Sequence, residues 1–546
     1  MVFTDAKQLL YEVSRRRTFA IISHPDAGKT TLTEKLLLLG GAIRLAGSVK
    51  AKKSKKFATS DWMELEKQRG ISISTSVMNF EYRNIVCNLL DTPGHQDFSE
   101  DTYRTLAAAD SAIMLIDAAK GVEPQTIKLF EVCRLRGIPI FTFVNKLDRD
   151  ARDPFELMQE IENILGIPTY PMNWPVSSGE RFGGVIDRKT KELHYFYGRN
   201  TTIETEAKII SLKNKEEIEK LVPQKLMQES IESLELLDAA GDDFQYEKFM
   251  KGQISPMFFG AAMTNFGVRF FLEKFLDMSP QPSPKNSSKG SISPLSEKFS
   301  GFIFKIQANM DPKHRDRIAF LRVVSGVYEA GIYVNVPRLQ REIKLTQPQQ
   351  FFAQDRTSIE KAFAGDVVGI YDPGIFSIGD SLVEKEQFEF EGIPSFAPEN
   401  FAVVRTTSAL KRKQLLKGLI QLCQEGTIQM FIDETRSLSD PILAAVGTLQ
   451  FDVLLFRLKN EYNVDCALDN LSYKFARWTN ASLEQVQEAK TKLDVTSVKD
   501  MHGNYVFLFK NDFSINYFQE NFPKLLLFRS NANLHHNMMD TSFLKE

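Results

Sequence analysis

The chain has 546 residues, more than one hydrophobic core usually supports, so its length predicts about three or four domains. Its composition, 43% hydrophobic and 25% charged, is that of a soluble globular protein, and no apolar run is long enough to span a membrane. The formal net charge of −2 gives no argument for binding nucleic acid by bulk attraction, and we expect no DNA partner. Three basic clusters, Arg15–Arg17, Lys50–Lys56 and Lys411–Lys413, are either solvated faces or local contacts for a polyanion.

Cysteine usage and the N-terminus both indicate a cytoplasmic protein. Cys87, Cys133, Cys423 and Cys466 lie far apart with no paired spacing, so we expect reduced thiols rather than a disulfide framework or a zinc site. The first residues carry an acidic residue early and arginines late, which is the reverse of a secretory signal.

The first strong motif lies in Ile21–Thr31, between an apolar strand-like run and a helical segment. The spacing Ser23-x-x-x-x-Gly28-Lys29-Thr30 is that of a phosphate-binding loop, with Ser23 in place of the first glycine. Backbone N–H groups at the start of the helix favour an anion, Lys29 can reach the β- and γ-phosphates, and the Thr30 hydroxyl can bind Mg²⁺. The alternative is an ordinary strand-to-helix turn.

The next stretch is predicted to form a loop, a short helix and a strand. Gly40–Phe57 is rich in Gly, Ala, Ser and Lys, Asp61–Arg69 has a helical pattern, and Gly70–Asn79 is predicted to begin a strand. Ser72 lies where a switch segment would place a hydroxyl on a metal, although an ordinary strand serine is the simpler interpretation.

A predicted buried strand at Ile85–Leu90 runs into Asp91-Thr92-Pro93-Gly94-His95. An aspartate at the carboxyl end of such a strand lies at the sheet edge where α/β proteins bind ligands, and Asp91 can hold Mg²⁺ through water there. Gly94 can bring its N–H close to a γ-phosphate. His95 is the candidate for positioning the attacking water.

Another predicted strand, Pro139–Val144, ends in Asn145-Lys146-Leu147-Asp148. The Asp148 carboxylate can accept two hydrogen bonds from guanine, from N1–H and from the exocyclic amine, whereas adenine offers neither. A site built on such bonds rejects the wrong base by roughly 10⁴–10⁵-fold. Asn145 would brace the loop, and the Lys146 stem can cover a face of the base. This motif predicts guanine as the base.

The first domain is predicted to span residues 1–278, with an insertion at about 168–257 that departs from the strand–helix alternation. The segments predicted around the motifs are strands at Ala112–Ile116 and Met257–Ala262 and helices at Thr31–Leu39, Pro124–Arg134, Pro154–Leu165, Thr205–Gln228 and Phe266–Leu276. Small residues at Gly260, Ala261 and Ala262 would let backbone N–H groups approach a base carbonyl.

Beyond it we expect a Pro-, Ser- and Gly-rich linker at 279–296, a β-barrel at 297–386 and an α+β sandwich at 387–546. The fold class is therefore multidomain α/β, with a phosphate-loop GTPase domain first. The barrel strands are predicted at Gly301–Gln307, Arg317–Val324, Ile332–Val336 and Val367–Tyr371. The last domain is predicted to have strands at Ala402–Thr406, Thr427–Asp433 and Val464–Leu468 and helices at Ser408–Glu425 and Pro441–Glu461. Neither later domain shows a catalytic constellation, and the polar stretch Asn531–Glu546 is predicted to fray.

Four motifs in chain order resemble the translational GTPases: Ser23–Thr31 (SHPDAGKTT), Ser60–Ile73 (SDWMELEKQRGISI), Asp91–His95 (DTPGH) and Asn145–Asp148 (NKLD). Within them, the chain is similar to the family of bacterial peptide chain release factor three over nearly its whole length. Ala445–Leu454 (AVGTLQFDVL) in the last domain also fits that family. Elongation factor G, the nearest related family, has a longer chain with further domains.

The resemblance implies GTP or GDP as ligand, with Mg²⁺, and hydrolysis of GTP. His95 matches the family's catalytic histidine, Pro25 and Ile71 match the apolar gate before it, and Asp26 matches a loop aspartate near the β–γ bridge of the nucleotide. The metal ligands implied are Thr30, Ser72 and Asp91, where Ser72 stands for the threonine of most relatives. Ala261 replaces a serine that many GTPases place near guanine O6. The implied nucleotide-binding residues are Ser23, His24, Pro25, Asp26, Ala27, Gly28, Lys29, Thr30, Thr31, Asp91, Thr92, Pro93, Gly94, His95, Asn145, Lys146, Leu147, Asp148, Gly260, Ala261 and Ala262.

The resemblance further implies a monomeric, ribosome-activated GTPase that removes class-I release factors from the ribosome after peptide release, with ribosomal RNA helping His95 to orient water. Two other classes fit the sequence less well. A metabolic NTP-using enzyme is disfavoured because no nucleophile–base pair or metal cluster follows Val383. A scaffold with a vestigial site is disfavoured by the intact Lys29, Thr30, Asp91 and Asn145. A nearer competitor, an elongation-type translocase, is disfavoured by chain length.

Overall fold

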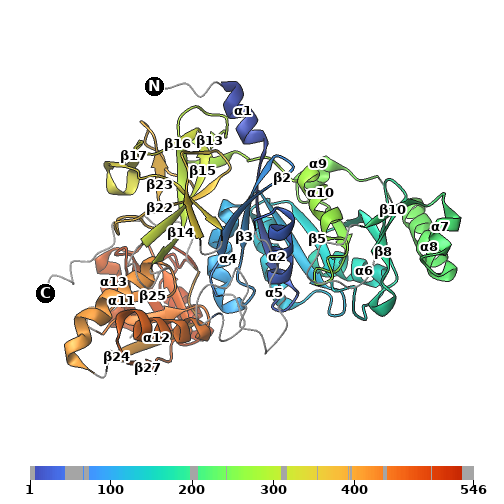
Figure 1. Ribbon diagram of the computed structural model, residues 1–546. Helices are drawn as coiled ribbons and strands as arrows, with labels where there is room; N and C mark the ends of the chain where they lie inside the picture. Colours follow the sequence, from blue (N-terminus) through green and yellow to red (C-terminus); the bar gives the residue numbers. More distant parts are fainter. Residues whose placement is uncertain are drawn as a thin grey trace.

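A computed structural model describes residues 6–42, 66, 73–196, 207–241, 243–308, 317–352, 355–391, 393, 396–406, 408–433, 440–493 and 495–531 (Figure 1). Ser72, Ile71 and the basic run Lys50–Lys56 lie outside the described residues. So do the helix expected at Asp61–Arg69, apart from Glu66, and the C-terminal stretch beyond Asn531.

The first domain is built on a seven-stranded sheet of order β2-β3-β1-β4-β5-β11-β6, parallel except where β2 pairs with β3. The strands are β1 (Arg16–Ser23), β2 (Ser76–Tyr82), β3 (Ile85–Asp91), β4 (Ser111–Asp117), β5 (Ile140–Asn145), β6 (Thr169–Pro171) and β11 (Ser255–Phe259). The helices are α2 (Lys29–Leu39), α4 (Ser99–Ala108), α5 (Pro124–Leu135), α6 (Pro154–Leu165) and α10 (Val268–Met278), preceded by α1 (Ala6–Ser14). The predicted strands and helices around the three motifs are thereby confirmed, within a few residues at their ends.

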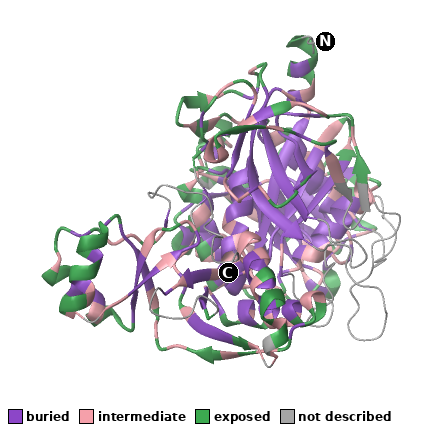
Figure 2. Ribbon diagram, turned by 90° about the vertical axis from the view of Figure 1, so that its left-hand side faces the viewer, coloured by how far each residue is buried: buried purple, intermediate pink, exposed green. Residues whose placement is uncertain are grey.

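Helices cover both faces of this sheet because its strands are apolar on both sides. Phe19 and Ile21 of β1 pack with α2 and α10 in one cluster of buried residues. Ala20 and Ile22 of the same strand pack with α4, α5 and α6 in another. Figure 2 shows the buried residues gathered on the strands and the exposed ones on the outer surfaces of the helices. The carboxyl ends of β1, β3, β4 and β5 meet at one sheet edge, where all three motifs follow their strands.

The insertion between β6 and β11 contains a four-stranded antiparallel sheet of order β10-β9-β8-β7. Its elements are β7 (Asn173–Val176), η2 (Gly179–Arg181), β8 (Gly184–Asp187), β9 (Glu192–Tyr195), β10 (Lys208–Ser211), α7 (Lys215–Glu219), α8 (Gln224–Ala240) and α9 (Tyr246–Met250). The predicted helix Thr205–Gln228 is wrong at its start, because Lys208–Ser211 pairs with β9 and buries Ile210 in the insertion's core. Sheet pairing overrides the charged, helix-like composition there.

The predicted linker is partly structured. It contains a hairpin of β12 (Lys285–Ser287) and β13 (Gly290–Ile292), and the backbone N–H of Ser288 donates to the Glu389 carbonyl at 2.8 Å. This hydrogen bond therefore anchors the linker to the segment around Glu389, which follows the second domain.

The second domain is an antiparallel β-structure, as expected for the predicted β-barrel. Its main sheet has the order β18-β17-β23-β14-β15-β22-β19-β20, and β16 and β21 form a second pair, around one apolar cluster. The elements are β14 (Ser300–Ala308), β15 (Arg317–Ser325), β16 (Val327–Glu329), β17 (Tyr333–Val336), η3 (Pro337–Leu339), β18 (Arg341–Lys344), β19 (Gln349–Phe352), β20 (Asp355–Ser358), β21 (Lys361–Phe363), β22 (Val367–Tyr371) and β23 (Ser381–Val383).

The third domain has one seven-stranded sheet of order β27-β24-β26-β25-β29-β30-β28 with helices packed on it, an α+β arrangement as predicted. The elements are β24 (Asn400–Thr406), η4 (Ala409–Lys411), α11 (Arg412–Gln424), β25 (Gln429–Ile432), β26 (Ile442–Ala445), α12 (Thr448–Tyr462), β27 (Cys466–Asn470), β28 (Phe475–Trp478), α13 (Leu483–Leu493), β29 (Thr496–Asp500), β30 (Tyr505–Phe509) and α14 (Asp512–Asn521). The single helix predicted over Pro441–Glu461 is wrong. Its first part is β26, which pairs with β24 and β25, and α12 begins only after Gly447.

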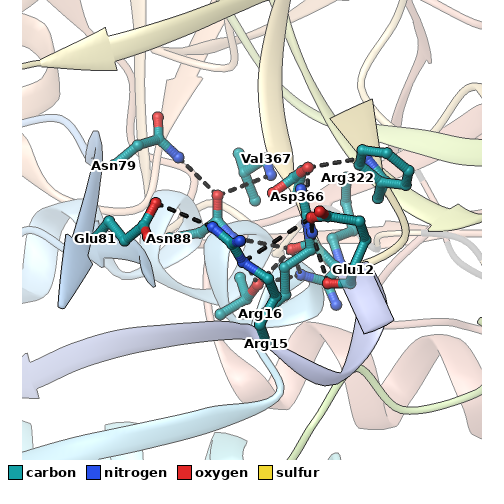
Figure 3. A network of polar contacts seen from close by, with 12 residues as sticks. Glu12, Arg15, Arg16, Asn79, Glu81, Asn88, Arg322, Asp366 and Val367 are labelled. Carbon is teal, nitrogen blue, oxygen red and sulfur yellow. Dashed lines mark hydrogen bonds and ion pairs between the residues drawn. The ribbon is translucent and has the colours of Figure 1, made fainter. Parts of the chain in front are cut away.

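A polar network joins the first two domains at the amino end of β1 (Figure 3). Arg16 Nε lies 2.8 Å from Asp366 Oδ2 and both side chains are buried. The side chain of Asn88 in β3 accepts a hydrogen bond from the Val367 N–H at 3.3 Å. Arg322 of β15, also drawn in Figure 3, pairs with Asp110, the residue just before β4. These contacts fix the second domain against the sheet that carries the motifs.

Candidate functional site

The phosphate-loop residues His24–Gly28 join β1 to α2 in a tight turn. Asp26 and Gly28 adopt positive φ values of 66° and 100°. A Cβ at Gly28 would overlap the side-chain amide of Asn145, so only glycine fits there. The phosphate loop therefore packs directly against Asn145, the first residue of the guanine motif.

Lys29, the first residue of α2, forms an ion pair with Asp91 at the end of β3. The side chains are only 7% and 1% exposed, respectively. Asp91 Oδ2 is buried and has no hydrogen-bond partner among the described residues. A buried carboxylate oxygen without a partner is costly unless a cation or a water meets it, which fits Asp91 as a group that faces Mg²⁺ or its waters.

His95 lies in the loop that follows β3, and its side chain is 30% exposed. Its Nδ1 accepts a hydrogen bond from the Asp97 N–H at 3.2 Å. Gly94 packs on the phosphate loop, since a Cβ there would lie 3.5 Å from Pro25 Cα. The histidine therefore stands beside the loop that would hold the phosphates.

At the other end of the site, Asn145 braces two segments as predicted. Its Nδ2 donates to the Ala27 carbonyl at 2.9 Å, and its Oδ1 accepts from the Ala262 N–H at 2.8 Å. Lys146 has a positive φ of 71° and donates to Asp117 Oδ2 at 2.7 Å and to the carbonyl of Asp26. Asp148 is half-buried and makes no side-chain hydrogen bond to any described residue, so its carboxylate is open to a base.

The segment Gly260–Ala262 differs in one respect from its predicted role. The Gly260 N–H donates to the Val144 carbonyl at 3.0 Å and the Ala261 N–H to the Phe266 carbonyl at 2.8 Å. The Ala262 N–H is taken by Asn145. All three N–H groups expected to approach a base carbonyl thus have protein partners. The segment instead supports the base motif, since the Leu147 N–H donates to the Gly260 carbonyl at 3.2 Å.

Sequence reasoning missed three acidic residues beside the site. Asp117 ends β4 and holds Lys146, Glu123 Oε1 lies 3.1 Å from His24 Nε2, and Asp97 contacts His95. Burial opposes ionisation of Asp117, but hydrogen bonds from Lys146 and from backbone N–H groups lower its pKa below the usual value. The position of Asp117 at the carboxyl end of a predicted strand was a signal that could have found it.

The remaining residues predicted for the site lie on the same sheet edge. Ser23 ends β1, Thr30 and Thr31 lie in the first turn of α2, and Thr92 Oγ1 donates to the Ile21 carbonyl at 2.7 Å. Across the described ranges, no group of three or more His, Cys, Asp or Glu residues could hold a metal. A cation here would depend on Asp91, hydroxyl groups and the phosphates. No helix in the described part of the chain is long and apolar enough to cross a membrane.

Comparison with known families agrees with this geometry. Residues 14–281 match the elongation factor Tu GTP binding domain, residues 298–385 match elongation factor G domain 2, and residues 390–519 match the class II release factor RF3, C-terminal domain. A crystal structure of a Thermus thermophilus protein has a similar fold, with a TM-score of 0.68 at 22% identity over 86% of this chain and 71% of that chain.

The phosphate loop, the buried Asp91 and the guanine motif, set in an elongation-factor-type GTP-binding domain, define a translational GTPase. Curated relatives show to which family of translational GTPases the chain belongs. The chain is 55% identical to peptide chain release factor 3 of Symbiobacterium thermophilum, over 95% of this chain and 98% of that protein. It is 54% identical to peptide chain release factor 3 of Gloeothece citriformis, over 95% and 96% of the two chains. The chain belongs to the peptide chain release factor 3 family.

Proposed function

We propose that this chain hydrolyses GTP when activated by the ribosome and thereby promotes dissociation of class-I release factors after peptide release. The observation that carries the proposal is the buried Lys29–Asp91 pair, with one carboxylate oxygen left without a partner, beside His95. The family to which the chain belongs supports the role in termination.

In this proposal the chain acts mainly by positioning. Lys29 would turn from Asp91 to the β- and γ-phosphates, and Thr30, Asp91 and Ser72 would hold Mg²⁺, which would supply positive charge to the phosphates. Asp148 accepts hydrogen bonds from guanine while Asn145 and Lys146 keep the loop in place. With its Nδ1 occupied by the Asp97 N–H, His95 has Nε2 left for the attacking water.

The remaining assignments are also proposals. The nucleotide contacts comprise the residues predicted from Ser23 to Thr31, Asp91 to His95 and Asn145 to Asp148, whereas Gly260–Ala262 supports the base motif through the Gly260 carbonyl and the Ala262 N–H. The partners are the ribosome, including its RNA, and class-I release factors; the protein is a cytoplasmic monomer that binds no DNA. The domain division is 1–278 with an insertion at about 168–257, then 279–296, 297–386 and 387–546.

Two assays test the proposal. GTP turnover is measured with and without ribosomes, and His95→Ala should lose on the order of 10²-fold of the stimulated rate while retaining GTP affinity. Lys29→Ala should instead weaken nucleotide binding. In the second assay, a labelled class-I release factor on a terminated ribosome should dissociate faster with the full chain and GTP. Unchanged residence of that factor would refute the termination role, and unstimulated GTP turnover would refute the enzymatic one.

A further inference from the structure

The segment that follows His95 makes a direct contact with the last domain. Asp97 lies in η1 (Gln96–Phe98), and its Oδ2 accepts a hydrogen bond from the Leu449 N–H at 2.8 Å. Leu449 is the second residue of α12, and N–H groups in the first turn of a helix have no partner within it. Asp97 therefore supplies an acceptor to a helix that lies 352 positions further along the chain.

Asp97 also holds His95. Its backbone N–H donates to Nδ1 of the imidazole at 3.2 Å, and its Oδ1 lies 3.3 Å from the same nitrogen. The side chain of Asp97 is only 9% exposed, so little space is left for it to turn away. The orientation of the His95 ring and the docking of α12 thus meet at one residue.

The last domain is shaped to receive this carboxylate. Gly447 precedes α12, and a Cβ there would overlap the Asp97 side chain. The turn is fixed by Gln450, whose Oε1 accepts from the N–H groups of Val446 at 2.8 Å and Gly447 at 3.1 Å. This accounts physically for the run Ala445–Leu454, which is typical of the family yet contains no catalytic group.

Two neighbouring contacts strengthen the junction. Phe98 is buried in an apolar cluster with Val453 of α12 and Ile73, the first residue described after Ser72. Arg104 of α4 donates to the Gly426 carbonyl at 3.3 Å, and a side chain at Gly426 would overlap the guanidinium. The last domain therefore contacts both segments that flank the phosphate site.

We propose that Asp97 is a positioning residue through which the docking of α12 sets the orientation of His95. This inference rests on the proposed function, in which His95 orients the attacking water. While α12 is docked, the Leu449 N–H fixes the Asp97 carboxylate, and the Asp97 backbone holds Nδ1. When α12 is displaced, Asp97 loses its tether and the imidazole loses its fixed orientation.

The test uses the full chain, saturating GTP and a titration of terminated ribosomes, so that kcat and KM are obtained separately. Asp97→Ala should lower kcat by about 10-fold or more, the effect of losing a hydrogen bond to a charged acceptor. Its KM for ribosomes and its affinity for GDP, measured with a fluorescent analogue, should change by less than about 3-fold. Asp97→Asn keeps an oxygen for the Leu449 N–H and should retain most of the rate.

Gly447→Ala attacks the same contact from the last domain, because the added methyl displaces the Asp97 carboxylate while the backbone of residue 447 stays in an ordinary extended conformation. It should lower kcat as Asp97→Ala does. Lys459→Ala, which removes an exposed charge at the other end of α12, is the control and should leave kcat unchanged.

The outcomes separate this inference from the proposed function. Normal stimulated turnover in His95→Ala would overturn the catalytic assignment itself. A defect in His95→Ala with none in Asp97→Ala would overturn only the positioning role.

A defect in Asp97→Ala but not in Gly447→Ala would overturn the link to the last domain, as would equal defects in the Asn and Ala variants of Asp97. GDP affinity that falls in step with kcat would show a purely structural role and also overturn the inference.

Discussion

The ion pair of Arg322 and Asp110 provides a direct test of how the first two domains are held together. Its side chains are 1% and 0% exposed, and the Arg322 guanidinium also donates to Thr18 Oγ1 and to the Gly365 carbonyl (Figure 3 shows the neighbouring part of this network). Arg322→Ala would leave the Asp110 carboxylate buried without its main partner. Removing one partner of a buried pair costs about 3–5 kcal/mol.

The surroundings of Asp110 indicate that the loss of stability in Arg322→Ala lies at the lower end of that range. Asp110 Oδ1 still accepts from Ser283 Oγ at 3.0 Å and lies 3.6 Å from Lys285 Nζ, so the carboxylate keeps partial compensation. We therefore expect a loss of about 3 kcal/mol. Replacing both residues, Arg322→Met with Asp110→Leu, should restore only part of it: the buried Arg322–Asp110 charges are removed together, but Lys285 loses its carboxylate and keeps the Ala109 carbonyl at 3.3 Å.

Urea unfolding with hydrogen exchange measures the effect, because a multidomain chain need not unfold in a single transition. Arg322→Ala should speed exchange in β1 and at the start of β22, because Arg16 contacts Asp366 and Thr18 contacts the Gly365 carbonyl across the interface. Arg338→Ala is the control: it breaks a pair of Arg338 with Asp380 that lies within the second domain, so it should loosen that domain without opening the interface. Unchanged unfolding of Arg322→Ala would refute the reasoning.

Three further predictions concern the site and the thiols. Asp148→Asn should lose GTP and gain xanthosine triphosphate in competition binding, and equal binding of ATP and GTP by the parent chain would contradict the guanine assignment. Asp117→Asn should weaken GTP binding by about 10-fold near neutral pH, since it removes the ionic partner of Lys146. Because the pKa of Asp117 is held below its usual 3.8, its contribution is complete above that value and is lost as the pH falls through the lowered pKa, so the gap between variant and parent should close only in strong acid. Burial raises the pKa of Cys133 to about 12 and that of Cys466 to about 11, so neither thiol should react quickly with iodoacetamide at pH 7 until the chain is unfolded; rapid labelling of the native chain would contradict this.

The parts of the site that could be predicted from the sequence are those that a short run of residues specifies by itself. The phosphate loop follows directly on a buried strand, and Asp91 and Asn145 are the last residues of two others; parallel strands bring their carboxyl ends to one sheet edge. What could not be predicted depends on distant residues. Nothing near Asp97 in the sequence indicates Leu449 as its partner, because that contact requires the placement of the whole last domain.

The errors in the predicted elements have the same origin. Ala444 and Ala445 favour a helix locally, which extended the predicted helix too far toward the N-terminus, but both pair within a sheet as part of β26. The backbone N–H groups of Gly260–Ala262 donate to Val144, Phe266 and Asn145 rather than facing a base, and the local sequence does not indicate these partners. In each case long-range hydrogen bonding decides between alternatives that local preference leaves open.

The second and third domains reach the phosphate site from two directions. Lys305 of β14 donates to Ser74 Oγ at 2.6 Å and to the Thr75 carbonyl, just after the position of the predicted metal ligand Ser72. Burial lowers the pKa of this lysine, with the Asp101 carboxylate 3.9 Å away as partial compensation. On the other side, Asp97 receives the Leu449 N–H. Two domains without predicted catalytic groups thus contact the segments that flank the nucleotide.

Such contacts have a thermodynamic consequence. If γ-phosphate binding changes the segments at Thr75 and Asp97, it must change how firmly the second and third domains dock on them. Coupling between binding sites is reciprocal, so a ribosome that displaces α12 from Asp97 must alter GTP affinity by the same factor by which GTP alters ribosome affinity. A chain that releases another factor by hydrolysing GTP needs such a difference between its two nucleotide states, and these two contacts are where the structure can generate it.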